Sequence, residues 1–331
     1  FVGKRYGARE LPPLLRLLEE RLIGHQGRLW FQPGERVETF IHAPATYSAA
    51  LCRHGLVREV VAELGSFPPV AQTMPDGDPV SEGVDWTPAF SYTIPEDARP
   101  GLYSLRLEAE GQPSFAVPMV VSTPAGPPRD PGRVLVLAST NTWQSYNIWG
   151  GRSRYRNFEA ELSAELGRAS RLKAFIPPAL WRWAKGRLPL PVKSLIGRVL
   201  GVSLSGSAPW KHAPLSVRRP FTNCALDEAA PCRPFTNHLA AGEWRVLHWL
   251  EREGYEYDII TGFELDRDPE RLSGYRAVIL STHCEYWSRR MYAALKVQHE
   301  QHGLWIVNLS GNSIYREVEF AADGTMRCVS L

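Results

Sequence analysis

A short segment rich in proline and glycine, residues 123–132 (TPAGPPRDPG), separates two stretches of different texture in this chain of 331 residues. Such a composition is typical of a linker between separately packed units. A chain of this length can form two domains that each bury a hydrophobic core. We therefore expect the molecule to divide at this segment.

The stretch before the linker, residues 27–122, predicts an antiparallel β-sandwich. Short runs that alternate apolar and polar residues are interrupted there by proline and glycine, as in 36–41 (RVETFI), 89–94 (AFSYTI) and 102–108 (LYSLRLE). Strands at this spacing indicate an immunoglobulin-like (Ig-like) sandwich, which is usually a structural or interaction module. Residues 11–23 (LPPLLRLLEERLI) have helical spacing, so we expect residues 1–26 to form an N-terminal helix or extension.

The stretch after the linker, residues 133–331, predicts an α/β domain with a mostly parallel sheet. Short apolar strands alternate there with amphipathic helices, with strands expected at 133–139, 257–260, 277–281 and 304–309 and helices at 244–253 and 289–301. This alternation is typical of parallel strands joined by right-handed crossovers. Because the sequence stops soon after a strand-like run, we expect the domain to be incomplete at its C-terminal end.

The net charge of +3 arises from one segment, since residues 166–226 contain eleven Lys and Arg and no Asp or Glu. We expect residues 153–235 to form a basic insert or lid. Basic residues interleaved with tryptophan, as in 181–185 (WRWAK), suit a membrane surface or nucleic acid. Prolines interrupt any long amphipathic helix there. The expectation is therefore a lid with at most a weak membrane-surface contact through 171–200, and no nucleic-acid partner.

Compartment signals favour a cytoplasmic protein. No apolar run is long enough to span a bilayer, and the first residues lack a signal-peptide pattern. The five cysteines are odd in number and lack C-x-x-C spacing, which argues against a disulfide framework or a structural zinc site.

The most informative candidate site follows the apolar run at 278–281, where the chain continues into His283, Cys284 and Glu285. Ligands bind at the carboxyl edge of open α/β sheets. His283 and Glu285 should point to one side of an extended strand end, where they could share a proton or ligate one metal. They could equally cap the following helix. Cys284 could be a nucleophile at a strand-to-helix turn, although its large neighbours argue against that.

Two further strand ends could line the same crevice. The strand at 133–139 continues into a polar and aromatic run that includes Tyr146 and Asn147, and Asn312 follows the strand at 304–309. Gly150 and Gly151 permit close approach of the backbone to a ligand, but the segment has no phosphate-loop pattern. Aromatic packing at a sheet edge and a simple turn are the alternatives.

Four strings together resemble the catalytic domain of the N,N-dimethylformamidase large (beta) subunit family: NTWQSYNIWGGRSRY, EWRVLHWLEREGYEYDIITGFEL, YRAVILSTHCEYWS and LWIVNLSGNSIY. The family pattern runs T-Y-x-A-Y-N, W-G-G-x-S, H-x-E-Y-W and G-G-N. The resemblance implies a glutamine-amidotransferase-like α/β domain. It also implies hydrolysis of amide C–N bonds at a mononuclear iron held by two tyrosines and a glutamate.

Carried over position by position, the resemblance assigns Glu285 and Tyr146 as iron ligands. The second family tyrosine falls at Trp143, whose indole cannot supply a phenolate oxygen, and Tyr155 could replace it only by a change of geometry. His283 would move protons to the departing amine. Asn147 or Asn312 would donate to the developing oxyanion.

The leading hypothesis is therefore a metal-assisted hydrolase that acts on a small-molecule linear amide with iron as cofactor. The basic insert departs from the family and indicates a different, larger or anionic substrate. The relatives also suggest a homo-oligomer. The alternatives are a non-catalytic ligand-binding protein that has lost the metal set, and a cysteine hydrolase that uses Cys284.

Overall fold

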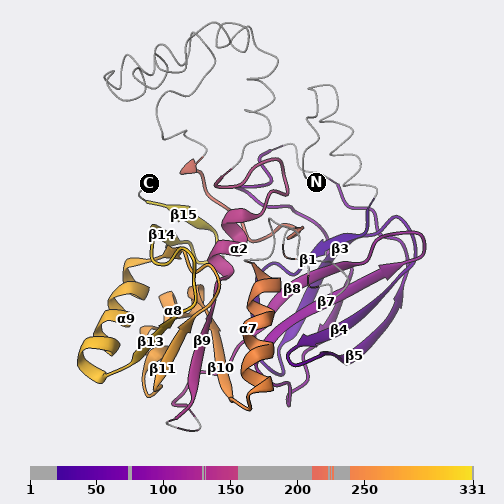
Figure 1. The fold of residues 1–331 in the computed structure, drawn as a ribbon. Helices are drawn as coiled ribbons and strands as arrows, with labels where there is room; N and C mark the ends of the chain where they lie inside the picture. The colour runs from indigo at the N-terminus through magenta and orange to yellow at the C-terminus, as the bar shows by residue number, and fades with distance from the viewer. Residues whose placement is uncertain are drawn as a thin grey trace, which may run out of the picture.

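The computed structural model describes residues 21–73, 77–128, 130, 132–155, 211–222, 224, 226 and 239–329. The fold is mixed: antiparallel sheets come first in the chain, and a parallel sheet with a few helices follows (Figure 1). Residues 1–20 and most of the expected basic insert, including 171–200, lie outside the described residues. Among the described helices, none combines the length and the apolar character needed to cross a membrane.

Two sheets in the first part share one hydrophobic core. The smaller is antiparallel and consists of β1 (Ile23–His25), β3 (Arg36–His42) and β6 (Phe90–Thr93). The larger has the order β2 (Trp30–Phe31), β8 (Phe115–Val121), β7 (Gly101–Ala109), β4 (Tyr47–His54) and β5 (Arg58–Phe67), antiparallel except between β2 and β8. Ile41 of the smaller sheet and Leu105 of the larger are both fully buried in the shared core. Alternation of apolar and polar residues along β3 places one face of that strand inward.

The helix expected over residues 11–23 is wrong at its C-terminal end. Ile23 belongs to strand β1, where it pairs with His42 of β3 and is only 4% exposed. Local helical spacing is a weak determinant, and pairing with a neighbouring strand outweighs it here. Residues 11–20 lie outside the described part of the chain.

A four-stranded parallel sheet forms the second part, with the order β10 (Tyr257–Thr261), β9 (Val134–Ala138), β11 (Ala277–Leu280) and β13 (Trp305–Asn308). Helix α7 (Ala240–Arg252) packs on the face that carries Val136. Helices α8 (Gly262–Arg267) and α9 (Arg289–His302) pack on the face that carries Leu135. Because both faces are covered, β9 and β11 consist of apolar residues that are almost all buried, and β10 is buried throughout.

Strands β9 and β11 are neighbours that run in the same direction, so the segments that follow them emerge at one edge of the sheet. Helix α2 (Thr140–Tyr146) begins directly after β9. A small sheet of β12 (Tyr286–Trp287), β14 (Arg316–Phe320) and β15 (Met326–Cys328) follows β11 beyond the same edge. The fold thereby brings α2 beside the segment that connects β11 to β12 (Figure 1).

The two parts of the chain are packed against each other. Leu102 and Val120 of the antiparallel sheets share a core with Val136 and Leu250 of the α/β part. Across the same contact, the Arg53 guanidinium lies 2.5 Å from the Glu251 carboxylate, which is located on α7. The division of the chain into two domains at residues 123–132 stays a prediction.

Candidate functional site

Helix α2 and the turn after β11 are joined by hydrogen bonds. The Thr142 hydroxyl donates to the His283 carbonyl at 2.5 Å and accepts from the Glu285 amide N–H at 3.4 Å. The Ser139 hydroxyl, just before α2, donates to the Ser281 carbonyl at 2.7 Å. Within this turn Thr282 has a positive φ of 41°, which is uncommon for a β-branched residue. The turn is therefore held in a specific shape, with the side chains of His283 and Glu285 on the side of α2.

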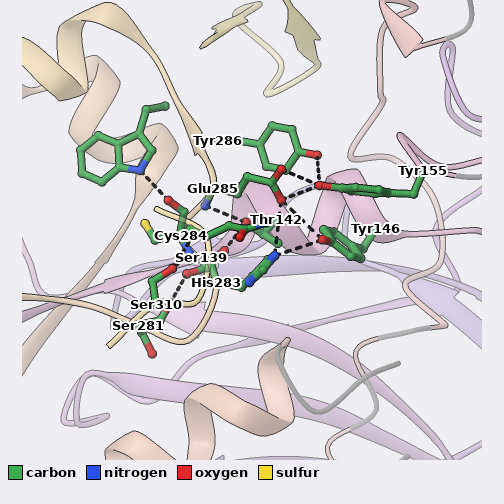
Figure 2. A network of polar contacts seen from close by, with 12 residues as sticks. Ser139, Thr142, Tyr146, Tyr155, Ser281, His283, Cys284, Glu285, Tyr286 and Ser310 are labelled. Carbon is green, nitrogen blue, oxygen red and sulfur yellow. Dashed lines mark hydrogen bonds and ion pairs between the residues drawn. The ribbon is translucent and has the colours of Figure 1, made fainter. Parts of the chain in front are cut away.

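The Glu285 carboxylate is fully buried at the centre of a polar cluster (Figure 2). The Tyr155 hydroxyl donates to it, at 2.5 Å from Oε1 and 2.6 Å from Oε2. The Tyr146 hydroxyl lies 3.5 Å from Oε2, and His283 Nε2 lies 3.4 Å from the same oxygen. His283 Nε2 is also 3.0 Å from the Tyr146 hydroxyl. Two phenols and one imidazole thus surround one carboxylate, and we call these four side chains the Glu285 cluster.

Both phenols of the Glu285 cluster hold their protons more strongly than a tyrosine in water. Burial raises the pKa of Tyr155 far above its usual value, and the neighbouring Tyr286 and Glu285 raise it further. Burial, followed by the charge of Glu285, also raises the pKa of Tyr146. At neutral pH both groups are therefore hydrogen-bond donors, and the Tyr286 hydroxyl donates to Tyr155 at 3.2 Å.

Tyr155 reaches the cluster because the chain folds back on α2. Gly150 and Gly151 have φ values of +88° and +96°, and a side chain at Gly150 would collide with Val80. After this turn the Arg154 amide N–H donates to the Ser145 carbonyl at 2.9 Å. The centres of the Tyr155 and Tyr146 rings then lie 4.4 Å apart. The glycine pair, which we expected to permit approach to a ligand, makes the turn that brings in the second phenol.

Trp143 points away from the Glu285 cluster. Its side chain is fully buried in the core that includes α7, and its indole N–H donates to the Glu243 carboxyl group at 2.7 Å. The tryptophan at the expected position of the second family tyrosine therefore has a structural contact, and Tyr155 provides the second phenol.

The two asparagines expected to stabilise an oxyanion lie outside the cluster. The Asn147 amide donates to the Pro220 carbonyl at 2.8 Å, and its oxygen accepts from the Trp149 amide at 3.2 Å, so this fully buried side chain holds a loop. The Asn312 side chain is exposed, and its backbone carbonyl accepts from Ser310. These contacts do not test the oxyanion role of Asn147 or Asn312, which stays a prediction.

Cys284 is not placed as a nucleophile. Its side chain is 5% exposed within the core that includes α9. Burial raises the pKa of its thiol to about 12, so very little thiolate exists at neutral pH. Side chains alternate along this segment, and the sulfur lies on the other side of the backbone from Tyr146 and Tyr155 (Figure 2). A cysteine hydrolase that uses Cys284 is therefore disfavoured.

Two buried residues that support the site were not predicted from the sequence. Glu243, at the start of α7, accepts from the Ser139 amide N–H and from the Trp143 indole at the two ends of the first turn of α2. Arg219 is fully buried and donates to the carbonyls of Gln144, Ser216, Asn147 and Trp149. The one sequence signal for Arg219 is its place in RPFTN, a string that occurs twice in the chain. The second copy lies outside the described residues.

The protonation of Glu243 should make stability depend on pH. Burial raises its pKa from 4.5 to about 8. Between these values the folded state holds a proton that the unfolded chain releases, so the contribution of Glu243 to stability is present below pH 4.5 and is lost as pH rises toward 8. Glu243→Gln removes this loss. The free energy of unfolding of Glu243→Gln minus that of wild type should therefore increase by about 1.4 kcal/mol for each pH unit between pH 4.5 and about pH 8.

Urea unfolding of both proteins at pH 5 and at pH 8 measures this difference. Glu319→Gln, which removes one exposed carboxyl group from β14, is the matched control. A Glu243→Gln variant with the same pH dependence as wild type would show that the buried carboxyl group is ionised throughout.

The donor atoms of the Glu285 cluster suit a hard cation. The described residues contain no group of three or more His, Cys, Asp or Glu that could hold a metal ion. The Glu285 cluster is not such a group, because two of its four members are tyrosines. Phenol and carboxylate oxygens are ligands that hard cations prefer, and oxygens this close together could bind the same ion. Because the phenols are protonated at neutral pH, binding would have to release their protons.

A buried carboxylate surrounded by titratable groups at the carboxyl edge of a parallel sheet is the kind of site found in α/β enzymes. The chain belongs to the N,N-dimethylformamidase beta subunit-like family, whose C-terminal model matches residues 52–330.

A named relative is the N,N-dimethylformamidase beta subunit of Alcaligenes sp., which is 23% identical over 286 residues. The aligned region covers 80% of this chain and 30% of the relative. The chain thus spans less than a third of that protein's length.

Proposed function

We propose that this protein hydrolyses the C–N bond of small linear amides. The observation that carries the proposal is the convergence of Tyr146, Tyr155 and His283 on the fully buried Glu285 carboxylate. Such a concentration of titratable groups at a sheet edge is typical of catalytic sites. Membership of the N,N-dimethylformamidase family supports amide hydrolysis as the reaction.

We also propose that iron is the cofactor, held by Tyr146, Tyr155 and Glu285. The family resemblance implies two tyrosines and one glutamate, and the Glu285 cluster has this composition once Tyr155 replaces the tyrosine lost at position 143. When bound, iron would supply a Lewis acid that polarises an amide carbonyl and lowers the pKa of a water molecule. The alternative of a binding protein that has lost its metal ligands rests on Trp143 in place of a tyrosine. Tyr155 weakens this alternative, because it supplies a second phenol beside Glu285.

The side chains of the cluster have separate roles in this proposal. His283 Nε2, within hydrogen-bonding distance of the Tyr146 hydroxyl, is the group that would move a proton to the departing amine. Thr142 fixes the backbone of both His283 and Glu285, so it orients the imidazole and the carboxylate. Burial of Glu285 excludes bulk water from the carboxylate, which strengthens its interactions with charge.

The finer fold assignment is part of the same proposal. We infer that the two antiparallel sheets with a shared core are an Ig-like sandwich. We likewise infer that the parallel sheet with helices on both faces is a glutamine-amidotransferase-like domain. The support is the sheet order and the position of the cluster at the carboxyl edge.

Release of amine from N,N-dimethylformamide and related linear amides by the purified 331-residue chain tests the function. We expect turnover that is lost on treatment with an iron chelator and restored by added iron. Tyr155→Phe should lower turnover by at least about a hundredfold, because it removes the hydroxyl that binds both oxygens of Glu285. Tyr315→Phe is the control, since that side chain is 62% exposed. Folded protein that carries iron and hydrolyses none of these amides would contradict the proposal.

A further inference from the structure

A pocket of about 40 Å³ adjoins the Glu285 cluster. Its lining consists of Arg154, Tyr155, Lys211, Tyr286, Arg316 and Cys328. Tyr155 connects the pocket to the cluster, because its hydroxyl contacts both the Tyr286 hydroxyl and the Glu285 carboxylate. A ligand in this pocket, which we call the Arg154 pocket, would therefore be a direct neighbour of the proposed reaction centre.

The Arg154 pocket is positively charged. Three of its six lining residues are cations, and none is an acid. The Arg154 side chain is buried, and it donates to the backbone carbonyls of Lys211 and Met326 while its Nε has no hydrogen-bond partner. Arg316 packs over the Tyr315 ring, 4.6 Å from its centre. Within the described parts of the chain, neither guanidinium forms an ion pair with a carboxylate.

A buried guanidinium without a counter-charge is unfavourable, and an anion in the pocket would relieve this cost. Burial lowers the pKa of Arg154 below its usual value, as expected for a cation removed from water. Burial raises the pKa of the Cys328 thiol, whereas Arg154 and Arg316 both act to lower it, so both cations lie close to this side chain. Among the described residues around the pocket, the two guanidinium groups of Arg154 and Arg316 outnumber the Glu285 carboxylate.

The pocket has room for a small polar group, since one water molecule requires about 10–15 Å³. A carboxylate is such a group, and its two oxygens match the planar fork of a guanidinium.

We propose that the Arg154 pocket binds the carboxylate group of a ligand whose amide lies at the Glu285 cluster. The preferred substrate would then be an amide with a carboxylate close to its C–N bond. The carboxylate in the pocket could also belong to the acid that amide hydrolysis releases. The assignment of a substrate class rests on the proposed function, whereas carboxylate binding can be observed without it.

Isothermal titration calorimetry with the purified 331-residue chain tests the proposal. The probes are N-acetylglycine, its neutral N-methylamide and acetate. We expect N-acetylglycine to bind about tenfold to a hundredfold more tightly than the neutral amide, which is the usual range for a charge-assisted contact. Arg316→Gln should remove most of this preference. Arg327→Gln is the matched control, because Arg327 lies on β15 but is exposed, whereas its neighbours Met326 and Cys328 are buried.

The probes also separate the two sources of the carboxylate. Acetate that binds as tightly as N-acetylglycine would support a pocket for the acid product, and tighter binding of N-acetylglycine would support an anionic substrate. Equal affinity for the charged and neutral amides, or a preference unchanged by Arg316→Gln in folded protein, would overturn the proposal. If amide turnover is found in that case, the proposed function stands without the pocket. Carboxylate binding without turnover would leave the pocket as a binding site alone.

Discussion

Replacement of Glu285 by glutamine should lower amide turnover by about a hundredfold to ten-thousandfold. Glutamine keeps the shape of the side chain and an oxygen that can accept from Tyr155. It removes the negative charge and adds N–H donors facing Tyr146 and His283, which already provide donors. The variant should also lose iron, because a neutral amide is a much weaker ligand than a carboxylate.

Amine release and iron content, measured on the same preparation, test this expectation. Glu319→Gln on the exposed side of β14 removes one carboxylate without contact to the cluster, so it should retain wild-type turnover. A folded Glu285→Gln variant with wild-type activity would remove Glu285 from the proposed mechanism.

Replacement of Arg219 by methionine should lower the free energy of unfolding by about 3–5 kcal/mol. The Arg219 guanidinium is fully buried, and it donates to carbonyls of Gln144, Asn147 and Trp149, which follow or end helix α2. Methionine fills much of the same volume but leaves these carbonyls without donors. Because Tyr146 lies between Gln144 and Asn147, the change should also displace the phenol and lower turnover.

Chemical unfolding of the variant measures the loss of stability. Arg219→Lys should restore only part of the lost stability. The planar guanidinium group of arginine donates to several carbonyls at once, and a single ammonium group cannot reach all of them. Arg218→Met is the matched control, because its side chain is exposed and belongs to the adjacent position. If Arg219→Met is no less stable than Arg218→Met, the carbonyls must have other donors.

Local sequence patterns were sufficient to predict the position of the Glu285 cluster in the fold. The apolar runs of β9 and β11 and the polar groups that follow them are contiguous in sequence. Parallel neighbours deliver such groups to one edge, so the approach of Tyr146 and His283 to Glu285 follows from strand order.

The remaining features depend on contacts between distant segments. Tyr155 joins the cluster only because Gly150 and Gly151 reverse the chain onto α2. Glu243 meets Trp143 from a position 100 residues away, and nothing near either residue in sequence indicates the contact. Helical spacing predicts a helix that ends at Ile23, whereas the pairing of Ile23 with β3 is a long-range interaction.

An anomalous-scattering map from crystals of the 331-residue chain, collected at the iron absorption edge, tests the central claim most directly. Our account predicts one strong peak within bonding distance of the Glu285 carboxylate and of the Tyr146 and Tyr155 hydroxyls. A peak bound elsewhere, or no peak in protein that hydrolyses amides, would contradict it.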